Sequence, residues 1–180
     1  YSSATACCKI QDAVGQVLDE QSDFDSFLSN GYRWNWTDFA GSAWSYSTLI
    51  LKGATFDIAT ILAPAATGNQ DITTSGATPS GVLLFGTGQT TADATIGSEA
   101  HLCIGASDGT SEGHIWSSED DVVNTDANMR TDTTKAIGVA TNPSTVAAEA
   151  DLTVSSGKYT LGWTTTRTNS RFFGVAFTDA

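Results

Sequence analysis

Residues 31–39 read GYRWNWTDF, and residues 157–165, near the other end of the chain, read GKYTLGWTT. Each stretch places a tyrosine ahead of an alternating run that ends in Trp-Thr. Successive side chains of a β-strand point to opposite faces, so this alternation predicts two strands, each with one buried apolar face. We therefore expect Trp34, Trp36 and Trp163 to be core residues.

The two stretches belong to a longer internal repeat. Their Trp-Thr pairs lie 127 positions apart, and the same offset aligns residues 44–50 with residues 171–177. Small insertions or deletions extend the alignment upstream. Because repeats reveal modular architecture, we expect residues 1–53 to be the C-terminal half of a first β module. Residues 54–180 are expected to form a complete module.

The repeat also bears on residues 7–18, whose apolar side chains recur at helical spacing. That spacing by itself favours an amphipathic helix. The repeat aligns residues 6–10 with residues 133–137, which are predicted to begin a strand. It therefore predicts strands at residues 7–10 and 17–27, with a turn between them.

The rest of the chain is organised as short apolar runs between Gly, Thr, Ser, Asn and Asp residues, which are typical of turns. The runs are residues 81–86, 100–105, 114–116, 135–139 and 171–177. Many short strands at this spacing favour a sandwich or a barrel. We predict an all-β antiparallel sandwich of jelly-roll type, preceded by part of a second module.

Composition argues against several classes of partner. The chain has a formal net charge of -12 and only 8 Lys and Arg residues, which are scattered. Nucleic-acid binding needs clustered cations, so neither nucleic acid nor an anionic membrane is expected as a partner. The chain contains no run of 18 apolar residues, so no membrane span is predicted. The three cysteines form no disulfide framework and are expected to be small buried residues.

Taken in order along the chain, a set of short motifs carries a family resemblance. They are LKG at 51–53, TGNQ at 67–70, TPSGVLLF at 78–85, GQT at 88–90, AHLCIG at 100–105, DGT at 108–110, SED at 118–120, EADL at 149–152 and GKYTLGWT at 157–164. This order resembles a β-rich module found, often in tandem, in structural proteins of tailed bacteriophages and related particles.

The resemblance implies a non-enzymatic protein on the virion surface, which decorates the head or tail or forms part of a fibre or spike. Its partners would be other virion proteins and copies of itself, as a homotrimer or another homo-oligomer, with no cofactor. In such modules a comparable stretch precedes the strand expected at residues 7–10. We therefore expect Tyr1 to lie within a module that upstream residues complete.

Three patterns with catalytic or metal-binding potential have simpler interpretations. Residues 105–109 match G-x-S-x-G, but a strand rather than a helix is predicted after them, so a hairpin turn is expected. His101, Cys103 and His114 are ligand types that zinc accepts, but no fourth ligand is evident. The acidic segment 119–132 lacks the spacing of a calcium loop. We predict no catalytic residue and no metal site.

Two tryptophans suggest an alternative function. Trp44 and Trp116 border segments that resemble turns, so both are candidates for exposure. An exposed indole beside polar groups is a common way to hold a sugar ring. The alternative is therefore a carbohydrate-binding adhesin that attaches to host surface glycan through Trp44 and Trp116.

Overall fold

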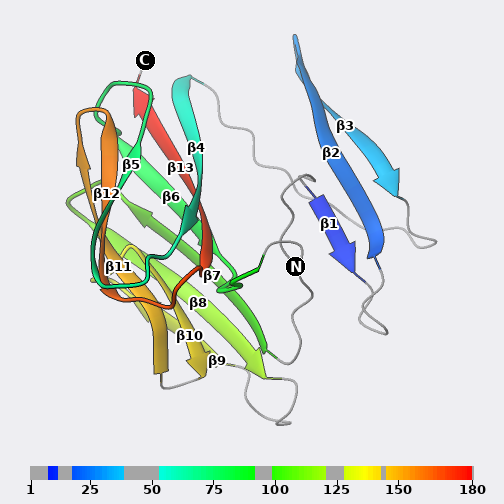
Figure 1. Cartoon of the computed structure of the whole chain (residues 1–180). Coiled ribbons are helices and arrows are strands. Elements are labelled where there is room, and N and C mark those ends of the chain that lie inside the picture. Colours follow the sequence, from blue (N-terminus) through cyan, green and yellow to red (C-terminus); the bar gives the residue numbers. More distant parts are fainter. Residues whose placement is uncertain are drawn as a thin grey trace. The chain divides into compact units, whose positions relative to one another are not determined.

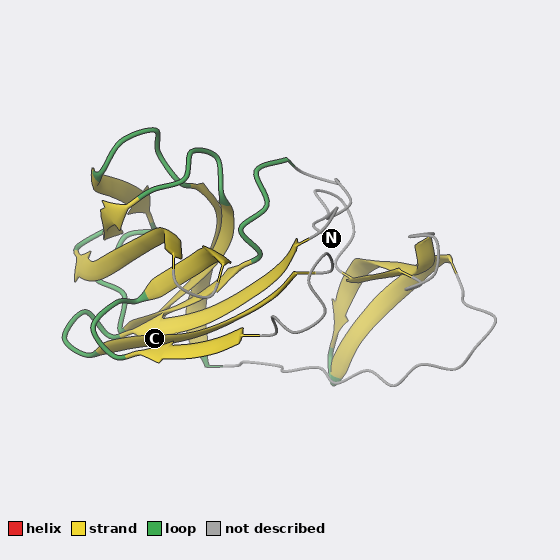
Figure 2. Ribbon diagram, turned by 90° about the horizontal axis from the view of Figure 1, so that it is seen from below, coloured by secondary structure: helices red, strands yellow, loops and turns green. Residues whose placement is uncertain are grey.

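The computed structural model describes residues 8–11, 18–38, 53–91, 99–120, 128–142 and 145–179. Throughout these residues the regular structure is β-strand, and Figure 2 shows strands and loops only. The chain divides into two compact units (Figure 1). Unit 1 comprises residues 1–50 and 92–95, and unit 2 comprises residues 51–91 and 96–180. The prediction of an all-β chain is confirmed.

Unit 1 contains one antiparallel sheet in the order β1-β2-β3. The strands are β1 (Cys8–Gln11), β2 (Leu18–Leu28) and β3 (Gly31–Asp38). The two strands predicted here by the repeat are confirmed, and the helical alternative is wrong for β1 and for the start of β2. Cross-strand pairing overrides local helical spacing, because it satisfies backbone hydrogen-bonding groups on both strands of each pair. The predicted turn at residues 12–15 lies outside the described residues.

Unit 2 contains two antiparallel sheets. The six-stranded sheet has the order β4 (Ala54–Leu62), β13 (Arg171–Asp179), β6 (Gly81–Gly86), β7 (Glu99–Ser107), β8 (Glu112–Asp120), β9 (Asn128–Asp132). The four-stranded sheet has the order β10 (Ile137–Asn142), β11 (Thr145–Ser155), β12 (Lys158–Thr165), β5 (Gly68–Thr73). The sheets pack face to face, as in a sandwich.

The core of unit 2 lies between the inner faces of the two sheets. Alternate residues of β7, β8, β12 and β13 are buried there, as the pleat of a strand requires. The Trp163 ring on β12 lies 5.5 Å from the Phe172 ring on β13, and the Trp163 Nε1–H donates to Oε1 of Gln70 (2.9 Å). The prediction that Trp163 is a core residue is confirmed, whereas Trp34 and Trp36 in unit 1 are only half-buried.

Two glycines let the sheets approach closely. A Cβ atom on Gly105 of β7 would collide with the backbone oxygen of Ala136, and one on Gly174 of β13 would collide with the hydroxyl oxygen of Tyr159. Both contacts join one sheet to residues in or beside the other. The absence of a side chain at these positions therefore sets the separation of the layers.

Candidate interaction surface

The outer face of the six-stranded sheet, which points away from the core, is largely apolar. On β7, Cys103 points inward and is fully buried, while its neighbours Leu102 and Ile104 point outward and are 50% and 39% exposed. The same alternation holds on β6, where Leu84 is buried and Phe85 is exposed. These strands are therefore apolar on both faces, although only one face is covered within the described part of the chain.

The pairing register aligns the outward side chains into rows across the sheet. Phe173 pairs with Phe85, Phe85 with Ile104, and Ile104 with Ile115. This row crosses β13, β6, β7 and β8 with large apolar side chains that are 37–48% exposed. Cross-strand neighbours lie within contact distance, so the row forms a continuous apolar band.

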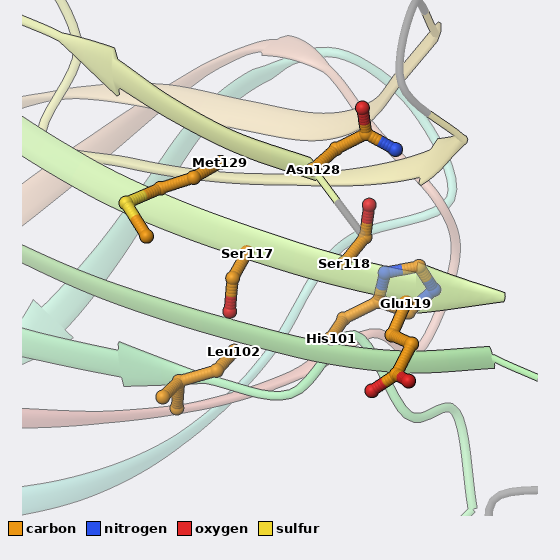
Figure 3. Close-up of a pocket in the computed structure, with 7 residues that line it drawn as sticks. All are labelled: His101, Leu102, Ser117, Ser118, Glu119, Asn128 and Met129. Atoms are coloured by element: carbon orange, nitrogen blue, oxygen red, sulfur yellow. The ribbon is translucent and has the colours of Figure 1, made fainter. Parts of the chain in front are cut away.

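Two further rows flank this band. One runs from Ile58 on β4 through Val175 and Leu83 to Ala106. The other aligns Leu102, Ser117 and Met129 on β7, β8 and β9, as Figure 3 shows. We call these side chains together the apolar outer patch: Ile58, Leu83, Phe85, Leu102, Ala106, Ile104, Ile115, Ser117, Met129, Phe173 and Val175.

The patch is hollowed near one end. A hollow of about 210 Å³ lies among Leu102, Ile104, Ile115 and Met129. A neighbouring hollow of about 310 Å³ reaches polar side chains at the ends of the strands, among them His101, Glu119 and Asn128 (Figure 3). An apolar centre with a polar rim is the usual anatomy of a protein interface.

A charged cluster connects the two sheets beside the patch. The Lys135 Nζ donates to Oδ1 of Asp151 (2.6 Å), and the backbone N–H of Leu152 donates to Oε2 of Glu112 (2.9 Å). Burial raises the pKa of Glu112, the Leu152 N–H lowers it, and the adjacent Asp151 carboxyl group raises it again. Since its carboxylate is engaged by backbone of β11, Glu112 links β8 to the opposite sheet.

The exposure expected for Trp116 is wrong. Trp116 lies on β8 with 4% of its surface exposed, on the inner face of the sheet. The strand extends on both sides of it, so the turn expected beside Trp116 is not there and its ring packs into the core. It therefore offers no flat surface for stacking a sugar. Trp44, the other candidate for sugar binding, lies outside the described residues.

Two of the three residues considered for zinc, Cys103 and His114, are engaged in the core. Cys103 Sγ accepts a hydrogen bond from the backbone N–H of Gly138 (3.4 Å), and burial raises the pKa of its thiol to about 12. His114 Nδ1 lies 3.0 Å from the backbone oxygen of Lys135. Within the described ranges, no three His, Cys, Asp or Glu side chains are grouped so that they could hold a metal ion.

The G-x-S-x-G match at residues 105–109 forms a hairpin, as predicted. β7 and β8 pair antiparallel on either side of it. The buried Ser107 Oγ accepts a hydrogen bond from the backbone N–H of Gly109 (3.0 Å), and Asp108 Oδ1 accepts from the N–H groups of Thr110 and Ser111. These bonds organise the turn. Half of the acidic segment, residues 121–127, lies outside the described residues.

Comparison with models of protein families, with curated proteins and with solved structures finds no match to this chain. Among the described residues, no helix is long and apolar enough to span a membrane. The evidence for function is therefore the geometry of the chain itself, and its most distinctive surface is the apolar outer patch.

Sequence reasoning did not identify this patch. A usable signal was present, because residues 82–85 and 102–104 are apolar at every position. Strands of this kind are usually covered on both faces. The sequence thus contained evidence for a second covering surface, but only the register shows that the outward residues of the strands adjoin.

Proposed function

We propose that this chain is a non-enzymatic structural protein on the surface of a tailed-phage virion, built on a jelly-roll type of sandwich. It would decorate the head or tail or form part of a fibre or spike, beside other virion proteins. The observation that carries the proposal is the apolar outer patch, because exposed contiguous apolar surfaces of folded proteins commonly mark assembly contacts. The order of sequence motifs supports the virion context.

The occupant we propose for the patch is a second copy of the chain. The eleven side chains of the patch lie about 4.8 Å apart across the strands and about 7 Å apart along them, and together span on the order of 400 Å². A stable interface buries roughly 800 Å² on each partner, so the patch is large enough for the centre of an interface but not for all of it. Polar neighbours such as Glu119 and Asn128 would complete the rim.

Self-assembly through the apolar outer patch is compatible with the charge of the chain. With a net charge of -12, copies repel one another at long range. The patch contains no carboxylate, so this repulsion is not concentrated where the copies would meet. Closed point-group symmetry, for example three-fold, would limit growth and give a homo-oligomer.

Mass spectrometry of gradient-purified particles from the source tests the proposal. We expect peptides of this chain in high copy among the virion proteins. Their absence from particles, together with recovery in the cell envelope or the secreted fraction, would overturn the virion assignment. A glycan array on the same purified chain tests the adhesin alternative, for which no described residue supplies an exposed tryptophan on unit 2.

A further inference from the structure

The sheet of unit 1 reproduces part of unit 2 residue by residue. Ser22 pairs with Trp36 in unit 1, and Ala150 pairs with Trp163 in unit 2. The register shifts immediately before Ser22 and immediately before Ala150, so both sheets carry an irregularity at the same place. The pair β2-β3 therefore corresponds to the pair β11-β12.

The correspondence continues into the neighbouring strand. Ile10 pairs with Glu20 as Val139 pairs with Ala148, and a register shift follows each of the two. Ile10 is thus the equivalent of Val139, two positions beyond the partner that the sequence alignment predicted. The register fixes this alignment because irregularities in pairing are specific structural features.

One residue explains the change of offset between the repeats within β2. A register shift between Phe24 and Ser26 leaves Asp25 without a place in the ladder, and β11 has no such shift opposite Leu161. Asp25 is therefore an insertion that the sheet accommodates as a bulge. Between Ser22 and Phe24 the offset is therefore one residue larger than it is downstream of Asp25.

The matched positions differ in burial. Tyr159, Leu161 and Trp163 are buried in the core of unit 2, and their equivalents are Tyr32, Trp34 and Trp36, which are half-buried. Leu152 and Val154 correspond to two residues of β2, Phe24 and Phe27, which are 46% and 79% exposed. We call Phe24, Phe27, Tyr32, Trp34 and Trp36 the aromatic face of unit 1.

The rings of the aromatic face contact one another along the sheet. The centroids of Phe24 and Phe27 lie 4.8 Å apart, and those of Trp34 and Trp36 lie 5.6 Å apart. Such contacts add to burial but do not replace it, because Phe27 still exposes most of its side chain to water. This surface has the composition of a core, but it is only partly covered.

The edge of the unit 1 sheet leads to the same conclusion. In unit 2, β12 pairs on its second side with β5, where Trp163 lies opposite Gly68. Within the described residues, β3 is an edge strand that pairs only with β2. Among the described strands, none occupies the position beside β3 that β5 occupies beside β12.

We propose that the aromatic face and the edge of β3 receive a half-module that directly precedes residue 1 in the full-length product. In unit 2, β4 to β9 (residues 54–132) supply β5 and most of the covering sheet, and all of them lie upstream of β10. The same chain order places their equivalents upstream of β1. In the sequence repeat, residues 44–50 align with residues 171–177, the segment that contains most of β13. This inference does not rest on the proposed virion function.

A second copy is a weaker candidate for this position. In unit 2 of any copy, β5 and the six-stranded sheet already contact the four-stranded sheet. A second copy could meet the aromatic face, but it has no spare equivalent of β5 for the edge of β3. The upstream half-module would cover the aromatic face and also pair with the edge of β3.

A graft that replaces residues 1–5 and keeps both units tests the inference. Residues 54–134 are duplicated and fused ahead of Ala6, so that the added half-module precedes β1 as the original precedes β10. We expect amide hydrogen exchange in β3 to slow at least about 100-fold and binding of an apolar dye to fall. A matched control graft carries Leu84→Asp in the added copy only, which removes an inner-face contact. The control should leave β3 exchange unchanged.

Equal exchange rates for the graft, the control and the parent chain would overturn the inference. Concentration-dependent protection of β3 in the parent chain would also overturn it, in favour of a second copy. Measuring the intact mass of the protein from its source is a second test of the inference, and it needs no graft. We expect a mass that includes an upstream segment at least as long as residues 54–132, and a native chain that starts at Tyr1 would contradict the proposal.

Discussion

The hydroxyl oxygen of Tyr159 on β12 lies in the space that a side chain on Gly174 of β13 would occupy. Tyr159 is buried, and its hydroxyl group has no hydrogen-bond partner among the described residues. Burial, with a smaller contribution from the negative charge of Asp57, raises its pKa to about 12, because the phenolate is disfavoured away from water and beside a carboxylate. The ring therefore stabilises the sandwich by packing, while the hydroxyl adds a desolvation cost.

Replacing Tyr159 with phenylalanine should therefore leave the free energy of unfolding unchanged or raise it by up to about 1 kcal/mol. Tyr159→Ala should lower it by about 3–5 kcal/mol, because a large cavity is left between the sheets. Urea unfolding followed by tryptophan fluorescence measures both values. A loss above about 1 kcal/mol for Tyr159→Phe would reveal a hydrogen-bond partner for the hydroxyl.

Because the two sheets approach closely, replacing a glycine with alanine should affect stability differently at two positions. Gly105→Ala should destabilise the protein by more than about 2 kcal/mol, because the new methyl group would displace the backbone of Ala136. Gly162 is the matched control, since a Cβ there meets its nearest atom, Oδ1 of Asn69, at an ordinary 3.6 Å. Gly162→Ala should cost less than about 0.5 kcal/mol. Equal melting temperatures for the two variants would disprove the close-approach argument.

Glu112 and Asp132 should make opposing contributions to the pH dependence of stability. The pKa of Glu112 is raised above its usual 4.5, mainly by burial, so the folded protein binds this proton more tightly than the unfolded chain. Stability from Glu112 therefore increases as the pH falls through the raised pKa toward 4.5. The pKa of Asp132 is lowered by hydrogen bonds from Thr134, so its contribution is present above its usual 3.8 and is lost below it.

Glu112→Gln separates these contributions. The amide oxygen of the variant can still accept the hydrogen bond from the Leu152 N–H. At about pH 7 the variant should be as stable as the parent protein or more stable. On mild acidification it should lack the increase in stability that the parent gains when Glu112 is protonated. Denaturant titrations of both proteins between about pH 7 and pH 4 give the comparison. An identical pH profile for parent and variant would show that Glu112 is not the responsible group.

The apolar outer patch should control self-association. Met129 is 79% exposed on β9, so Met129→Glu should leave folding intact while it introduces a carboxylate into the patch. Ile115→Glu tests the central row in the same way. We expect each variant to weaken association at least about 10-fold, equivalent to about 1.4 kcal/mol, in sedimentation velocity.

Thr145→Glu is the control for charge alone, because Thr145 is exposed on β11 of the other sheet. It should associate like the parent chain. Equal weakening by Thr145→Glu and Met129→Glu would attribute the effect to net charge rather than to the patch. A parent chain that stays monomeric at high concentration would remove the basis for homo-oligomeric assembly.

Cys103 should be protected from alkylation in the folded protein. Its thiol is buried, and a pKa of about 12 leaves almost no thiolate at neutral pH. Peptide mapping after iodoacetamide treatment should find Cys103 modified at least about 100-fold more slowly in buffer than in denaturant. Rapid labelling of the folded chain would mean that the inner face opens locally.

Much of the fold follows from local pattern. Alternation around Tyr159 and Trp163, the turn residues at 108–111 and the internal repeat were sufficient to predict strands, hairpins and an all-β chain. They succeed because the two-residue period of a strand and the backbone preferences of turn residues act over a few neighbouring positions. The repeat also overruled the helical spacing of residues 7–18, which nearest-neighbour pattern alone would have favoured.

Tertiary structure decided the rest. Trp116 was expected outside because it borders a segment that resembles a turn, but its strand continues on both sides and the second sheet covers the face on which it lies. The bulge at Asp25 and the pairing of Ile10 depend on contacts between strands that no local pattern records. The apolar outer patch likewise exists only because register aligns Phe173, Phe85 and Ile104 across strands that are distant in the sequence. Sequence by itself determined which residues form strands, and the long-range packing of those strands determined which side chains became core and which became surface.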